Sequence, residues 1–160
     1  MNTKLTVLVA LVASLTGGLT PSKADDSFTC PVTKAASVEF DPPSAFAGSR
    51  ENLFGTEKLF TIFPGNWHSK QQSERGYRVP KIVWGSAVFD LAKEWERNTL
   101  TITGRRLDAA SGSLEFDRAN TARSGGGYFI TSEFYVPTLG CWEVIGHFHG
   151  TDLKIVTDLK

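Results

Sequence analysis

The chain has 160 residues, of which 41% are hydrophobic, and its 17 basic side chains balance 17 acidic ones. This length is sufficient for one domain with its own hydrophobic core. The balanced charge argues against nucleic acid or an anionic membrane as partner, because both require a basic face.

The first 24 residues have the pattern of a secretory signal peptide. Lys4 precedes an apolar run over 5–15, and Ser22 and Ala24 occupy the positions that a signal peptidase reads. The run is shorter than the roughly 20 residues of a membrane-spanning helix, so a membrane anchor is the less favoured alternative. We therefore expect cleavage after Ala24, a secreted or periplasmic protein, a single domain over 25–160, and no membrane span in that domain.

Two cysteines, Cys30 and Cys141, remain after this cleavage. An exported chain meets an oxidising compartment, where an even number of cysteines indicates disulfide bonding. We predict one disulfide between them, which would link the start of the domain to its end. A nucleophilic cysteine is the alternative, but it requires a free thiolate and a neighbouring base.

Short segments with apolar residues at every second position follow one another along the chain. They are rich in β-branched and aromatic residues and are bounded by Gly, Pro, Asn, Asp or Ser, which is typical of strands. Their number in one domain predicts an antiparallel sandwich or barrel. The segments are 58–63, 79–85, 99–107, 128–136, 141–149 and 153–159, with 37–40 as a further candidate.

Three segments depart from this alternation. Residues 87–98 place Val88, Leu91 and Trp95 at helical spacing, so the segment is either a short helix or a long connecting loop. Residues 66–78 and 108–127 are polar and predict exposed loops, the second with a brief strand at 114–116. Loops of this length are unusual in a compact domain and often carry function. Trp67 and Gly125 mark them as candidate partner-binding surfaces.

The last strands contain the candidate metal ligands His147 and His149. On an extended strand they share a face, while Trp142, Val144 and Phe148 share the opposite face, which we expect to be the core. Two histidines spaced by one residue can bind one zinc or copper ion, but such a site needs a third ligand, and none lies nearby in the sequence. Two solvated histidines beside a turn are therefore the favoured interpretation.

Arg105 and Arg106 are candidate ligands for a carboxylate or phosphate. Alternation along the strand directs these two side chains to opposite faces, so they cannot easily grip one anion together. Structural ion pairing is the favoured interpretation, and partner binding is the alternative.

Several motifs indicate a resemblance to known proteins. Cys30-Pro31, FGTEKLFTIF from Phe54, TITGRRLD over 101–108 and GCWEV over 140–144 together resemble a group of poorly characterised exported bacterial proteins. The resemblance implies an immunoglobulin-like antiparallel β-sandwich of about seven strands, with one disulfide and room for a short helix. It supplies no activity, and the histidine pair departs from its pattern.

The sequence offers no motif for catalysis. It lacks a GxSxG nucleophile turn, and the glycines over 125–127 lack the GK[ST] ending of a phosphate loop. We therefore predict an exported, non-enzymatic binding or accessory module of the cell envelope, without a cofactor, whose partner is an unidentified protein or carbohydrate. The alternatives are a zinc- or copper-binding protein using His147 and His149, and a hydrolase with an unrecognised site.

Overall fold

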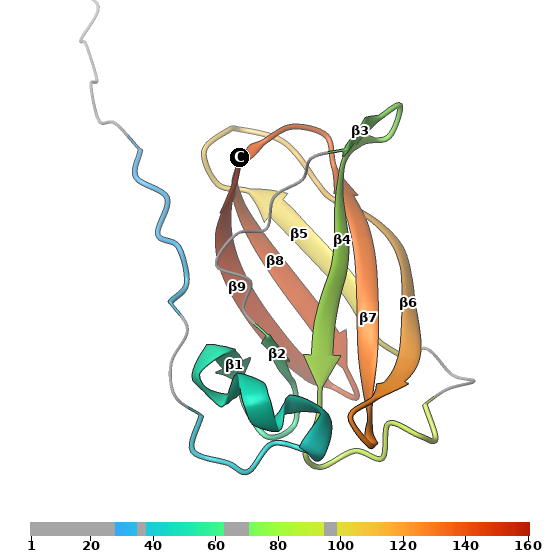
Figure 1. Cartoon of the computed structure of the whole chain (residues 1–160). Coiled ribbons are helices and arrows are strands. Elements are labelled where there is room, and N and C mark those ends of the chain that lie inside the picture. The colour runs from blue at the N-terminus through green and yellow to red at the C-terminus, as the bar shows by residue number, and fades with distance from the viewer. Residues whose placement is uncertain (1–27, 35–37, 63–70, 95–98) are drawn as a thin grey trace, which may run out of the picture.

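The protein is an antiparallel β-sandwich, seen here in a computed structural model that describes residues 28–34, 38–62, 71–94 and 99–160 (Figure 1). The larger sheet has the strand order β1-β2-β4-β7-β6, with β3 paired to β4, and the smaller sheet has the order β5-β8-β9. The predicted all-β sandwich is confirmed. The strands are β1 (Leu53–Gly55), β2 (Phe60–Ile62), β3 (Gln71–Ser73), β4 (Gly76–Gly85), β5 (Thr101–Arg106), β6 (Glu115–Ser124), β7 (Gly127–Val136), β8 (Gly140–Phe148) and β9 (Thr151–Leu159).

Six of the predicted strand segments correspond to β2, β4, β5, β7, β8 and β9, whereas the candidate first strand is wrong. Residues 38–40, from the candidate first strand, are not extended into a sheet. Residues 87–94 form bends and turns rather than a helix, and 95–98 lie outside the described residues. The helical segment is instead the 3₁₀ helix η1, Ser44–Asn52.

The largest correction concerns the predicted loops. Half of 108–127 is the ten-residue strand β6, which pairs with β7 along its length through a tight turn. The described part of 66–78 forms the hairpin of β3 and β4. β6 is an edge strand with few large apolar residues, so its sequence does not show the strong alternation of a strand with one fully buried face.

The main core lies between the two sheets and is centred on two tryptophans. Trp84 of β4 and Trp142 of β8 are fully buried. The Trp84 ring lies against Gly146 of β8, where an added Cβ would stand 2.6 Å from ring atom Cζ3. The Trp84 indole N–H donates a hydrogen bond to Ser132 Oγ on β7 at 2.8 Å, so its only polar atom is satisfied inside the core. The predicted core face of β8, with Trp142, Val144 and Phe148, is confirmed.

A second, smaller core lies on the outer side of the larger sheet. Phe46 of η1 and Phe60 of β2 are buried there in edge-to-face contact, with ring centroids 4.8 Å apart. Val83 and Phe129 also pack against this cluster. Helix η1 therefore covers the part of the outer face near the β6–β7 turn, and no other described helix lies on that face (Figure 1).

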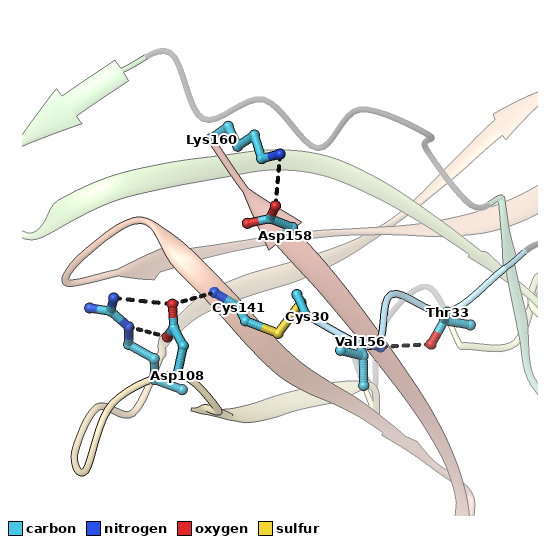
Figure 2. The surroundings of a disulfide bond; sticks show 8 residues. Cys30, Thr33, Asp108, Cys141, Val156, Asp158 and Lys160 are labelled. Atoms are coloured by element: carbon cyan, nitrogen blue, oxygen red, sulfur yellow. Dashed lines mark hydrogen bonds and ion pairs between the residues drawn. A yellow bond between two sulfur atoms is a disulfide. The ribbon is translucent and has the colours of Figure 1, made fainter. Parts of the chain in front are cut away.

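The predicted disulfide joins Cys30 to Cys141 at the start of β8, with their Cα atoms 5.5 Å apart (Figure 2). The segment after Cys30 runs beside the edge strand β9, where Thr33 N–H donates to the Val156 carbonyl and Val156 N–H donates to Thr33 Oγ1. The covalent bond thus holds the beginning of the domain against the smaller sheet. Among the described residues, no helix has the length and apolar character needed to cross a membrane.

The first prediction concerns this disulfide. Replacing both Cys30 and Cys141 by Ser should lower the free energy of unfolding by about 2–5 kcal/mol. The disulfide joins residues 111 positions apart and restricts the unfolded chain, so its loss raises the conformational entropy of the unfolded state. Urea denaturation followed by tryptophan fluorescence measures the loss. Reductant should destabilise the wild-type protein by a similar amount and leave the double variant unchanged. Two free thiols in the non-reduced wild type would contradict the prediction.

The second prediction concerns the contact of Trp84 with Gly146. Gly146→Ala should destabilise the fold by about 1–3 kcal/mol, because the added methyl group overlaps the indole ring and forces the two sheets apart. Gly48→Ala is the matched control, since a Cβ at Gly48 meets no atom within 4 Å. Thermal denaturation of both variants makes the comparison, and equal melting temperatures would show that the sheets tolerate the larger side chain.

Candidate functional site

Two β-bulges shape the open part of the larger sheet's outer face. On β4, Val79 lies opposite Phe134 and Ile82 lies opposite Ser132, so β4 contains one extra residue there. On β6, Phe116 lies opposite Phe134, whereas Arg118 lies opposite the adjacent Glu133. Both strands that flank β7 are therefore bulged beside Glu133.

The β4 bulge changes which residues of that strand face outward. Val79, Ile82 and Trp84 are all buried in the core between the sheets, although strict alternation would place Val79 opposite to the other two. The extra residue restores their common direction. As a result Arg78 and Lys81 both lie on the outer side, and Lys81 adopts a positive φ of 53°.

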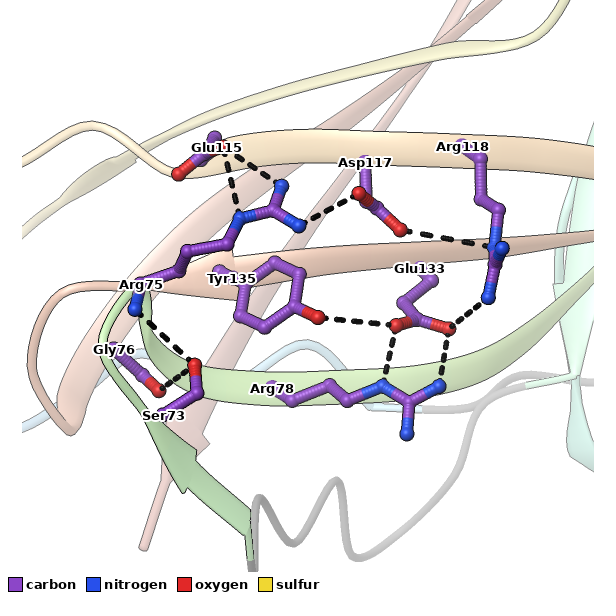
Figure 3. Close-up of polar contacts among 9 residues, drawn as sticks. All are labelled: Ser73, Arg75, Gly76, Arg78, Glu115, Asp117, Arg118, Glu133 and Tyr135. Carbon is purple, nitrogen blue, oxygen red and sulfur yellow. Dashed lines mark hydrogen bonds and ion pairs between the residues drawn. The ribbon is translucent and has the colours of Figure 1, made fainter.

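Charged side chains from three strands and one turn meet on this open face. We call this group the arginine face. It is shown in Figure 3 and consists of Arg75, Arg78, Glu115, Asp117, Arg118, Glu133 and Tyr135.

Glu133 lies at the centre of the arginine face, and its side chain is only 10% exposed. Arg78 donates from Nε and Nη2 to its two oxygens, with 2.6 Å between Nη2 and Oε2. Arg118 approaches from the opposite side, its Nη2 3.7 Å from Oε2. The Arg78 hydrogen bonds lower the pKa of Glu133, and this effect outweighs the opposing effect of burial.

Arg75 occupies the turn between β3 and β4 and holds the end of β6. Its Nη2 donates to Glu115 Oε1 at 2.7 Å, and its Nη1 donates to Asp117 Oδ1 at 2.8 Å. Its guanidinium lies 3.9 Å from the centre of the Tyr135 ring, within the range of a cation–π contact. The turn that carries Arg75 is fixed because Arg75 N–H donates to Ser73 Oγ.

The arginine face borders a shallow depression of about 180 Å³. Three cations surround it, Arg78 and Lys81 from β4 and Arg118 from β6, and β7 forms its floor. The described side chains that line it are all polar: Arg78, Lys81, Arg118, Asn120, Thr131, Ser132 and Glu133.

The predicted anion ligands Arg105 and Arg106 are both engaged in ion pairs. Arg105 donates from Nε to Glu143 Oε1 at 2.9 Å, and Lys154 Nζ lies 3.1 Å from the other oxygen of that carboxylate. Hydrogen bonds from Arg105 and then Lys154 lower the pKa of Glu143. The Arg105 side chain is nevertheless 69% exposed, so a partner can reach it.

Arg106 is more enclosed and supports the disulfide region. It donates from Nε to Asp108 Oδ1 and from Nη1 to Thr138 Oγ1, each at 2.6 Å. Asp108 in turn accepts a hydrogen bond from the backbone N–H of Cys141 at 3.2 Å (Figure 2). These contacts give Arg106 a structural role, and a role of either arginine in partner binding stays a prediction.

The two histidines have separate sets of partners. His147 uses both ring nitrogens on the outer face of the smaller sheet, with Nδ1 2.7 Å from Asp152 Oδ1 and Nε2 2.7 Å from Thr103 Oγ1. His149 lies in the β8–β9 turn with φ 46°, and its Nε2 is 3.0 Å from Glu94 Oε1.

His149 also joins two parts of the chain. Its ring stacks on Phe89 with centroids 4.5 Å apart, and the buried Glu94 also accepts a hydrogen bond from Thr99 Oγ1 at 2.8 Å. The turn that follows β4 is thereby attached to the β8–β9 hairpin. Glu94 is buried, and its two carboxylate oxygens contact Thr99 and His149.

The remaining candidates are placed as follows. Within the part of the chain that the structure describes, no group of three or more His, Cys, Asp or Glu residues could hold a metal ion. The metal site at His147 and His149 therefore stays a prediction without an identified third ligand. Gly125 lies in the β6–β7 turn with φ 60°, near Ala45 of η1. Trp67 lies outside the described residues.

Comparison with protein-family models, curated proteins and solved structures finds no match to this chain. The resemblance carried by TITGRRLD and GCWEV stays a prediction. The functional argument therefore depends on the geometry of the chain's own residues.

The third prediction concerns the pH dependence of stability. Because the folded protein lowers the pKa of Glu133, this group stabilises the fold above its unfolded pKa of about 4.3, and the contribution is lost as the pH falls through the folded pKa. Glu133→Gln should destabilise the protein at neutral pH and weaken the decline of stability in acid. Urea titrations from neutral pH to below pH 4 measure both effects.

Glu115→Gln is the control for Glu133→Gln, because the Glu115 side chain is 58% exposed and its ion pair is screened by solvent. We expect this variant to follow the wild-type pH profile closely. If the stability of Glu133→Gln declined in acid as steeply as that of the wild type, the lowered pKa of Glu133 would not contribute to the pH dependence of folding.

Proposed function

We propose that this protein is an exported, non-enzymatic binding module of the cell envelope and that it contacts its partner through the arginine face. The observation that carries the proposal is the convergence of Arg75, Arg78 and Arg118 on the part of the sheet that η1 does not cover, where hydrogen bonds to carboxylates hold Arg75 and Arg78. Each guanidinium lies beside at least one carboxylate of neighbouring strands.

Preorganisation makes this surface suited to binding. A long side chain that is already held in one geometry loses less entropy when a partner orders it. Arg78 is held by Glu133, and Arg75 by Glu115 and Asp117, so their positions depend on the register of β4, β6 and β7. A rigid scaffold that presents oriented donors is a common basis for recognition.

Export from the cytoplasm and an immunoglobulin-like type of sandwich are parts of the same proposal. The signal-peptide pattern of residues 1–24 and the Cys30–Cys141 disulfide are consistent with an oxidising compartment outside the cytoplasm. Two packed antiparallel sheets with a buried Trp142 next to the disulfide support assignment of an immunoglobulin-like type.

The fourth prediction tests this function by retention of envelope material. Purified protein is immobilised, exposed to envelope extract and washed, and the retained protein and carbohydrate are quantified. The double variant Arg75→Gln/Arg118→Gln should retain about tenfold less than the wild type, since it removes two of the three guanidinium groups from the face. Arg50→Gln is the control, because Arg50 is a partly exposed arginine of η1 outside the arginine face.

Cell fractionation of a bacterial host that expresses the full chain completes this test. The protein should be found outside the cytoplasm with a mass that corresponds to cleavage after Ala24. Retention of no envelope material by the wild type would contradict the binding function. Equal retention by the double variant would exclude the arginine face as the contact surface.

A further inference from the structure

The depression beside Glu133 has the chemistry of a site for an acidic sugar. Resting on the proposed binding function, we propose that Lys81 and Arg118 bind the carboxylate of a uronic acid unit in an envelope or extracellular polysaccharide. Arg78, Asn120 and Thr131 border the space in which the ring would lie.

The charges around the depression leave a cationic surplus at its rim. Glu133 is already neutralised by the two hydrogen bonds from Arg78. Arg118 is 3.7 Å from both Glu133 and Asp117, beyond the usual length of a hydrogen bond, and its side chain is 61% exposed. Its N–H donors therefore remain available to an external carboxylate.

Lys81 is the second cation available to a ligand. Across the described ranges of the chain, the structure shows no ion pair for Lys81, and the residue is exposed at the rim. Its φ of 53° is unfavourable for a residue with a side chain. Backbone strain of this kind concentrates at binding sites and switches, and the β4 bulge directs Lys81 to the same outer side as Glu133.

The spacing of these two cations suits one anionic group between them. Lys81 lies on β4 and Arg118 on β6, and β7 separates the two strands. Neighbouring strands are about 4.8 Å apart, so the two backbones are separated by roughly 10 Å. Long side chains from both sides can converge on one carboxylate above Glu133.

The composition of the lining favours a sugar over a protein partner. Hot spots of protein interfaces are mostly Trp, Tyr and Arg side chains in desolvated pockets, and among the described side chains neither an aromatic nor an aliphatic residue lines this depression. It offers cationic donors, the amide of Asn120, the hydroxyl of Thr131 and the oxygens of Glu133, a mixture that matches a ring bearing hydroxyl groups. Its volume of about 180 Å³ is below that of sites for drug-sized ligands, consistent with one sugar unit.

The fifth prediction tests this site by calorimetric titration of the purified protein with a short oligomer of galacturonic acid. We expect binding that weakens as salt is added, since exposed charges carry it. Lys81→Gly and Arg118→Gln should each lower the affinity about tenfold. Lys81→Gly should remain folded, because glycine adopts positive φ without strain. Lys93→Gln is the control, an exposed lysine outside the depression.

Four comparisons decide the assignment. Equal binding of a neutral galactose oligomer would overturn it, as would equal binding of inorganic phosphate or of an acidic peptide. Unchanged affinity of both Lys81→Gly and Arg118→Gln for the galacturonate oligomer would show that it does not bind in this depression. If envelope material is still retained through the arginine face but the galacturonate oligomer does not bind, this inference fails and the proposed function stands. If the wild type retains no envelope material, the proposed function itself fails.

Discussion

The packing of Trp84 against Gly146 determines which side of the larger sheet faces solvent. The indole ring must enter the space between the sheets, where the missing side chain of Gly146 leaves room for it and Ser132 accepts its N–H. Side chains alternate along strands, so burial of Trp84 and Ser132 directs Thr131 and Glu133 of β7 outward. The position of a carboxylate on the outer face thus follows from a contact inside the core.

The paired bulges then bring the cations to that carboxylate. If the same β4 sequence formed a regular strand without the bulge, Arg78 would share the direction of Trp84 and enter the core, where an unpaired charge is strongly unfavourable. The bulge in β6 places Asp117 and Arg118 side by side at the surface, within reach of Arg75 and Glu133. Bulges on both neighbours of β7 at the same level are therefore a structural requirement for the arginine face.

The sequence predicts the smaller sheet better than the larger one, for a physical reason. β9 alternates cleanly, with Leu153, Ile155 and Leu159 on its buried face, and in β8 Trp142, Val144 and Phe148 mark the buried face. β6 is a charged edge strand with one small buried residue, Ala119, and a buried Thr121, so it lacks that signal. A proline inside a central strand indicates a bulge, and Pro80 in VPKIVWG was the available clue to the β4 bulge. The ion pairs across β4, β6 and β7 depend on register, which a single sequence does not reveal.

The arginines divide into two groups by what their sequence neighbours allow. Arg105 and Arg106 attract attention because they are adjacent, yet adjacency on a strand separates their side chains, and Arg106 stabilises the loop that holds Cys141. Arg75 and Arg78 come from the β3–β4 turn and the adjoining start of β4, whereas Arg118 comes from β6, far along the chain. Strand pairing brings them onto one face, where carboxylates hold Arg75 and Arg78 by hydrogen bonds and the Arg118 side chain stays largely exposed. A surface that binds one anion needs such convergence, and the register of the larger sheet supplies it.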